Sequence, residues 1–278
     1  TGTLVQTVNH GSNATQVTAV ANANYHFVNW SDGSTVNPRT DTNVTANITV
    51  TANFAIDTYT VTYIAGANGS ITGTLVQTVN HGSNATQVTA VADANYHFVN
   101  WSDGSTVNPR TDTNVTANIT VTANFILNSY TISAAVNPLN TGTVTGLGSG
   151  IFNHGDVVSL TANPNEEYVF TAWVEGTDTV STFTVYSFTA TANRNLVAHF
   201  ELKQYLITLE ANPENGGTVN FAAQYFPHGS EVTIIATPNS DDFYLFVNWS
   251  EDGAVLEGAE ATYTFTALSD RSFIANFA

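Results

Sequence analysis

The sequence predicts an all-β protein made of four tandem modules of about 70 residues, and three observations support this. A tryptophan ends the same aromatic pattern four times along the chain. Thr and Asn fill most polar positions, and these residues favour pleated strands and turns respectively. No segment shows helical periodicity over ten or more residues. The four tryptophans are Trp30, Trp101, Trp173 and Trp249.

The repeat is explicit in the first half of the chain. Residues 1–54 match residues 72–125 at every position but one, where Asn22 stands against Asp93. Two more divergent copies follow, and each copy places a His-Gly pair about twenty residues before its tryptophan and closes on Ala-x-Phe. Self-similarity at a fixed period is the signature of a repeat architecture. We therefore expect repeats at residues 1–57, 58–128, 129–203 and 204–278.

The joints between copies are short and regular. From each closing Phe to the next Tyr is five positions, and the residues between contain no Gly or Pro. Such linkers are too short for free tumbling of the modules. We expect the four modules to form an elongated, semi-rigid rod.

Within the second copy, alternating β-branched and aromatic residues separated by turn residues predict about six short strands, and we expect about six in each module. A sandwich, a roll and a β-grasp-like sheet all fit this number. The first copy has no counterpart of residues 58–71, so we expect it to lack its first strand. Either the chain is an excerpt from a longer array, or an open edge accepts a strand from a neighbour. The expected strands are residues 59–64, 71–79, 87–92, 96–101, 111–116 and 120–125.

Composition excludes several function classes. There are 22 acidic against 5 basic residues, for a net charge of −17, which disfavours binding to nucleic acid or to an anionic membrane. The chain has no cysteine, which excludes disulfides and thiolate metal sites. No apolar stretch approaches the length of a membrane span, so no membrane insertion is expected within this segment.

The recurring motifs resemble a known repeat family. Tyr-His-Phe-Val-Asn-Trp occurs twice and is varied twice, and each copy ends on Ala-x-Phe. Together with the strand after the His-Gly turn, these motifs resemble the divergent internalin-B-type repeats of bacterial and archaeal surface proteins. The resemblance covers essentially the whole chain. It implies secreted, multi-repeat, cell-surface proteins, often adhesins, whose repeats carry no enzymatic activity.

The aromatic runs have two interpretations. Large aromatic side chains are readily buried, so we expect the recurring Phe and Trp to fill the module cores. Strict alternation along residues 25–30 would place Phe27 and Trp30 on opposite faces. The tyrosine that begins each run is a candidate ligand-facing residue, because its polar tip can stay in water. The expected core aromatics are Phe27, Trp30, Phe98, Trp101, Phe170, Trp173, Phe246 and Trp249, and the candidate ligand-facing tyrosines are Tyr25, Tyr96, Tyr168 and Tyr244.

Metal, glycan and catalytic sites find little support in the sequence. One His-Gly pair per module cannot supply the three or four ligands of zinc, so these histidines are expected in turns. Asp32, Asp41 and Asn43 could bind Ca²⁺ but lack the regular spacing of a calcium loop. We expect no cofactor, and no catalytic set stands out from the turn residues. The sequons that are candidate glycan sites are Asn13, Asn47, Asn68, Asn84 and Asn118.

These observations favour a non-enzymatic extracellular repeat region that acts as a cell-surface stalk or adhesin scaffold. Two alternatives stay open. One is a subunit of a self-assembling extracellular fibre joined by β-strand addition. The other is a carbohydrate-binding repeat array. The expected partners are other copies of the chain, or surface glycans or proteins of a host or a neighbouring cell.

Overall fold

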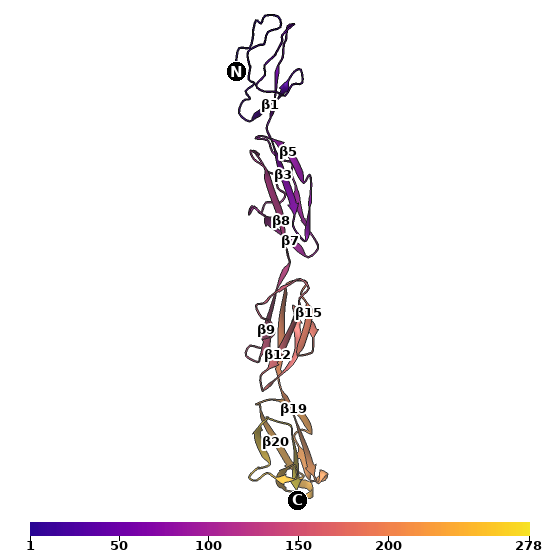
Figure 1. Ribbon diagram of the computed structural model, residues 1–278. Coiled ribbons are helices and arrows are strands. Elements are labelled where there is room, and N and C mark those ends of the chain that lie inside the picture. Colours follow the sequence, from indigo (N-terminus) through magenta and orange to yellow (C-terminus); the bar gives the residue numbers. More distant parts are fainter. The chain divides into compact units, whose positions relative to one another are not determined.

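The computed structural model describes residues 1–278, apart from the side chain of Asp242. It confirms the all-β class, with repeats of about 70 residues (Figure 1). Helical structure in the described residues is limited to two single-turn 3₁₀ helices, η1 (Glu214–Gly216) and η2 (Ser240–Asp242). None of the described helices is long and apolar enough to cross a membrane. The chain divides into two compact units, residues 1–128 and 129–278, each containing two repeats.

The second repeat contains six strands, which matches the expected number, and they are arranged in two open sheets. Four strands form one sheet in the order β5-β3-β8-β7, and β4 pairs with β6 in the other. β3 and β8, the first and last strands of the repeat, are parallel and occupy the centre of the larger sheet. The strands are β3 (Thr58–Ala65), β4 (Gly69–Thr72), β5 (Val76–Asn80), β6 (Thr89–Ala92), β7 (Tyr96–Trp101) and β8 (Ile119–Leu127).

The third repeat has the same central parallel pair and more strands. Its larger sheet runs β11-β9-β16-β13-β14 and its smaller sheet β10-β12-β15. The strands are β9 (Ser129–Asn137), β10 (Gly142–Thr145), β11 (Ile151–Asn153), β12 (Val157–Pro164), β13 (Tyr168–Glu175), β14 (Asp178–Ser181), β15 (Val185–Thr189) and β16 (Arg194–Leu202).

The fourth repeat follows the third strand for strand. Its sheets run β19-β17-β24-β21-β22 and β18-β20-β23, with β17 and β24 as the parallel pair. The strands are β17 (Gln204–Asn212), β18 (Gly217–Val219), β19 (Ala223–Pro227), β20 (Glu231–Pro238), β21 (Phe246–Glu251), β22 (Ala254–Val255), β23 (Thr262–Thr266) and β24 (Arg271–Phe277).

Each complete repeat buries one core between its two sheets. In the second repeat, Val61 and Val121 from the larger sheet meet Ala90 from the smaller one around Trp101. The third and fourth repeats build equivalent cores around Trp173 and Trp249. Of the architectures left open by the sequence, the two-layer sandwich describes these repeats.

Two strand predictions need correction. The segment predicted as one strand, residues 71–79, is two strands in different sheets, because the chain turns at Gly73, whose φ is +109°. A Cβ at Gly73 would lie 2.9 Å from the Gln87 carbonyl oxygen, so glycine is needed there. The strand predicted at residues 111–116 is a loop, whose backbone bonds to the turn around Ser83 rather than to another strand.

The first repeat differs most from expectation. Its two described strands, β1 (Tyr25–Trp30) and β2 (Ala52–Ile56), form a two-stranded sheet, which Figure 1 shows among coil. The remaining pairing consists of isolated bridges between Ser12 and Val44 and between Val17 and Arg39. A prediction of about six strands in every repeat is therefore wrong for this one.

A β-bulge in the aromatic strand of every repeat corrects the predicted alternation. The register of β1 with β2 shifts between Phe27 and Asn29, and β7, β13 and β21 shift at the corresponding place. A bulge adds one residue to one strand and reverses which face the following side chains occupy. Phe27 and Trp30 therefore lie on the same face, with ring centroids 5.6 Å apart.

Candidate functional site

Each repeat contains one arginine, and together with Lys203 these make up the five basic residues of the chain. Each arginine binds an acidic residue that stands two positions after the tryptophan of its repeat. This cluster of acid, arginine and aromatic ring recurs in all four repeats, and we take it as the candidate site. The arginine–acid pairs are Arg39–Asp32, Arg110–Asp103, Arg194–Glu175 and Arg271–Glu251.

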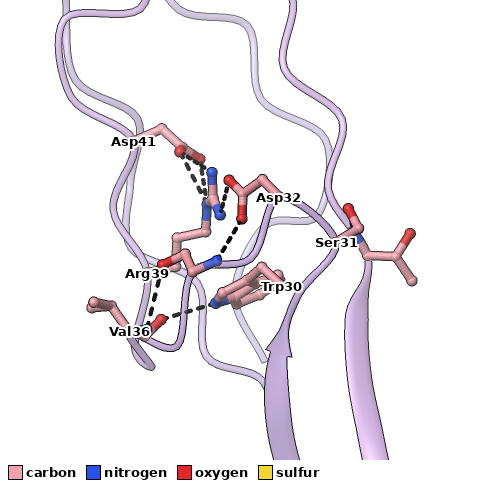
Figure 2. A network of polar contacts seen from close by, with 8 residues as sticks. Trp30, Ser31, Asp32, Val36, Arg39 and Asp41 are labelled. Atoms are coloured by element: carbon pink, nitrogen blue, oxygen red, sulfur yellow. Dashed lines mark hydrogen bonds and ion pairs between the residues drawn. The ribbon is translucent and has the colours of Figure 1, made fainter.

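In the first repeat the arginine lies between two carboxylates, as Figure 2 shows. The Nη1 atom of Arg39 is 2.7 Å from Asp32 Oδ2, and Nη2 is 2.6 Å from Asp41 Oδ1. The guanidinium carbon lies 5.5 Å from the centroid of the Trp30 ring, within range of a cation–π interaction. The Trp30 indole N–H donates to the carbonyl of Val36 at 2.9 Å. These contacts fix the loop between β1 and β2 to the strand it follows.

The second repeat adds a tyrosine to the same cluster. Arg110 bridges Asp103 and Asp112, and the hydroxyl of Tyr63 on β3 donates to Asp112 Oδ2 at 2.7 Å. Tyr63 also contacts Trp101 edge-on, with ring centroids 5.9 Å apart. In the first repeat the described cluster consists of Arg39, its two carboxylates and the Trp30 ring.

The cluster keeps its acidic groups ionised. Burial raises the pKa of Asp112, but hydrogen bonds from Arg110 and Tyr63 outweigh this, and the pKa lies below its ordinary value. Hydrogen bonding to Arg110 likewise lowers the pKa of Asp103. Burial, together with the bond to Asp112, raises the pKa of Tyr63. Groups shifted in these directions keep their charge states at neutral pH, and they are poor proton-transfer groups there.

The third and fourth repeats reach the same arrangement from a different sequence position. Arg194 and Arg271 are the first residues of β16 and β24, where the second repeat has Ile119 at the start of β8. Arg194 binds Glu175 and covers the Phe188 ring at 4.2 Å. The acid after the tryptophan is thus common to all four repeats, whereas its arginine comes from the loop in two and from the last strand in two.

The geometry supports a structural role for these clusters. The carboxylates are engaged by an arginine, and the candidate calcium residues Asp32 and Asp41 have Arg39 between them. Across the described residues, no group of three or more His, Asp or Glu side chains is placed to hold a metal ion. The binding of Ca²⁺ stays a prediction that this arrangement does not favour.

The structure places the expected core aromatics in or against the cores. The four tryptophans are buried, at 6% exposure for Trp30 and 0% for the others. The phenylalanine three positions earlier is half-buried in each repeat, and it lies between the tryptophan ring and the phenylalanine that closes the repeat. Among the candidate ligand-facing tyrosines, Tyr25 is 47% exposed, whereas Tyr168 and Tyr244 pack against their own cores and Tyr96 is half-buried.

The histidine of each complete repeat contacts the tyrosine that begins the repeat. The Tyr59 hydroxyl lies 3.5 Å from His81 Nδ1, and the ring centroids are 5.8 Å apart. Tyr130–His154 and Tyr205–His228 repeat the contact. These pairs are not among the sequence-based predictions, although a nearly constant separation of 22 to 24 residues indicates them.

The candidate glycan asparagines are exposed. The side-chain oxygens of Asn13 and Asn84 accept backbone hydrogen bonds from the following loop, and that of Asn118 accepts one from the Thr60 amide. Asn68 lies in a turn with φ of 67°. Glycosylation stays a prediction.

Comparisons with known proteins agree with the repeat pattern. The model of a family described as a divergent InlB B-repeat domain matches residues 1–58, 59–129, 132–204 and 207–278. One similar solved structure is described as the Bacillus anthracis TIE protein, with 8% sequence identity and a TM-score of 0.33. That similarity covers 82% of this chain and 53% of that one, so the chain spans about half its length. No curated protein matches significantly. The family match confirms the resemblance to internalin-B-type repeats.

Proposed function

This chain belongs to the divergent InlB B-repeat family, and from that premise we propose that it is a non-enzymatic spacer on a cell surface. Repeats of this family are typically non-catalytic parts of surface proteins. In the proposal, the repeats hold a binding region at a distance, and the number of repeats sets that distance.

The observation that carries the proposal is how adjacent repeats are joined. A single linker residue bonds to both repeats through its backbone. The amide of Asp57 donates to the Asn24 carbonyl in the first repeat at 2.9 Å, and its carbonyl accepts from the His81 amide in the second at 2.8 Å. Lys203 makes the same two bonds, to Glu167 in the third repeat and to His228 in the fourth. Bonds on both sides of a linker restrict its rotation, which suits a spacer.

The arginines and tryptophans of the modules support the same proposal. The arginines form ion pairs within their own repeats, and the tryptophans are buried. These are the residue types most often found at binding hot spots. A module that uses them for its own stability is better suited to spacing than to recognition.

Small-angle X-ray scattering with light scattering tests the proposal. A spacer predicts a monomer near 29.6 kDa with a radius of gyration on the order of 30 Å, whereas a compact body of this length would have about 19 Å. A matched variant lacking residues 129–203 removes one whole repeat and should shorten the maximum dimension by about a quarter. A radius of gyration near the compact value, or no shortening in the deletion variant, would contradict the proposal.

A further inference from the structure

In the second, third and fourth repeats, the first and last strands are neighbours in the larger sheet and run parallel to each other. In the third repeat they are β9 and β16, which pair over six residues, from Ile132 opposite Arg194 to Asn137 opposite His199. β17 and β24 pair in the same way over six residues, and β3 and β8 over five. Only Lys203 separates β16 from β17, so almost no slack chain lies between the last strand of one repeat and the first of the next.

This topology decides how a pulling force along the chain acts on a repeat. The force draws β9 toward its N-terminal end and β16 toward its C-terminal end. Because the two strands are parallel, these ends lie at opposite ends of the pair, and the force slides one strand past the other. The hydrogen bonds run between the strands, so sliding loads them all together. Two strands pulled from the same end of their pair would instead separate one bond at a time.

Side-chain hydrogen bonds add to the same pair on its exposed face. In the third repeat, Asn193 Oδ1 accepts the Thr131 amide at 2.8 Å. Two residues further along each strand, the Ser133 hydroxyl donates to Asn195 Oδ1 at 2.5 Å. The fourth repeat makes both bonds at the same register with other residue types, so the connection between the strands recurs although its side chains differ. The corresponding pairs there are Leu206–Asp270 and Thr208–Ser272.

The inner face of the pair belongs to the core of the repeat. Ile132 of β9 and Leu196 of β16 are each 1% exposed and pack in the cluster that contains Trp173. On its other edge, β16 pairs with β13. Sliding of β9 past β16 therefore also exposes buried aliphatic surface, and this opposes the movement.

From this topology we propose that the parallel pair of each of these repeats is a mechanical clamp, meaning a set of bonds that must break together before the repeat unfolds. The repeats then carry tension along the chain without lengthening. This goes beyond the spacer function, because a spacer needs only length, whereas a load-bearing repeat must also resist pulling. The two proposals can fail independently, since scattering measures the length at rest and the experiment below measures lifetime under force.

The test changes the direction of the force on the third repeat while its fold stays the same. The chain has no cysteine, so two introduced thiols take DNA handles for optical tweezers at chosen points. The whole chain with Ser129→Cys and Glu201→Cys is pulled along the strands, because these residues lie beyond opposite ends of the paired stretch. The matched control has Ser129→Cys with Ala192→Cys, which lie beyond the same end. All three replaced side chains are exposed.

At the same constant force, we expect the repeat to survive about tenfold longer or more in the first geometry, because bonds that break together add to one unfolding barrier. A step close to the extended length of the residues between the handles, at most about 3.5 Å for each, identifies complete unfolding of the repeat. Equal lifetimes in the two geometries, or a longer lifetime in the second, would overturn the proposal.

A pair of single substitutions then locates the load within the repeat. Ser133→Ala removes the bond to Asn195 and should shorten the lifetime in the first geometry by about threefold or more. Ser187→Ala removes a similar bond, 2.9 Å long to Ser159 Oγ, between β15 and β12 of the smaller sheet. It should change the lifetime by less than about twofold, because those strands lie outside the loaded pair. Equal effects of the two substitutions would contradict a clamp formed by β9 and β16.

Discussion

The first and second repeats have almost the same sequence but different structures. Over residues 1–54 and 72–125 they differ at one position, yet four strands of the second repeat, β5 to β8, lie in that stretch and the first repeat forms two. Phe54 is 40% exposed in the first repeat, whereas Phe125 packs against the core of the second. The second repeat has β3 in addition, and that strand lies at the centre of its sheet. Identical local sequence therefore forms strands only where a non-local partner is present.

This comparison has a physical basis in how sheets gain stability. A strand contributes by pairing and by packing against neighbours on its buried face, so its intrinsic preference is weak. Residues 89–92 form β6 opposite β4, but the corresponding residues 18–21 lie outside any strand, although their sequence is the same. The strand β6 has its partner β4 beside it, and residues 18–21 have no such partner, so pairing rather than local sequence decides whether this segment is a strand.

The largest effect is expected from a substitution in β3 that prevents this strand from packing in the second repeat. Val61→Asp places a charge at a fully buried position of β3 and should lower the free energy of unfolding of this repeat by about 4 kcal/mol or more. Each repeat has one tryptophan whose indole N–H is bonded to a carbonyl, so four indole signals follow the four repeats separately in a urea titration by NMR.

The control for that change is Thr60→Asp, which puts the same charge on the exposed face of the same strand. It should shift the Trp101 transition by less than about 0.5 kcal/mol. A small effect of Val61→Asp on Trp101 would mean that β3 does not hold the repeat together.

A smaller effect is expected where the two clusters differ by one tyrosine. Asp112→Asn weakens the bonds to Arg110 and Tyr63 and should cost the second repeat about 1–3 kcal/mol at neutral pH. Asp41→Asn should cost the first repeat less, because Asp41 has the arginine but no tyrosine partner. Urea titration of the Trp101 and Trp30 signals measures both, and equal costs would contradict a stabilising role for Tyr63.

The same carboxylate predicts an acid-sensitive stability. The folded-state pKa of Asp112 is lowered, so its contribution is fully present above the unfolded-state pKa of about 4 and is lost as the pH falls through the folded value. The Asp112→Asn chain should show a flatter pH dependence of the Trp101 transition in this acid range. An unchanged slope would show that other groups cause the loss.

The smallest effect concerns the one position at which the two repeats differ. Asn22 and Asp93 are exposed in equivalent turns, and each carbonyl accepts the amide of the tyrosine three residues on. Exchanging them, with Asn22→Asp and Asp93→Asn, should change either transition by less than about 0.5 kcal/mol. A larger effect would indicate that this turn, and not the presence of β3, causes the structural difference between the two repeats.

Sequence reasoning located most elements of the second repeat but not their pairing. Residues 96–101 were predicted within their true bounds, because aromatic alternation and flanking turn residues mark the strand. Residues 111–116 have the composition of a strand but form a loop in this repeat, while the corresponding β15 and β23 of the later repeats pair with β12 and β20. Residue composition shows that a segment is able to form a strand, whereas the presence of an unpaired neighbouring strand decides whether it does.

The candidate site was harder to predict. The acid after each tryptophan was visible in the sequence, and so was the Trp-Ser-Asp-Gly turn. Its arginine partner was not, since Arg39 lies seven positions further along a loop and Arg194 lies at the start of another strand. The bulge after Phe27, which brings Phe27 and Trp30 to one face, cannot be recognised from the alternation of residues along the strand either.

By itself the sequence determined that this protein is a tandem array of small β modules, because periodic motifs and turn residues are local features that can be recognised without knowing any tertiary contact. Only the tertiary structure decided which strands pair in parallel at the centre of each larger sheet, and that the arginines close on the acid after each tryptophan. The physical reason is that sheet pairing and burial select these partners, and a local sequence pattern does not specify them.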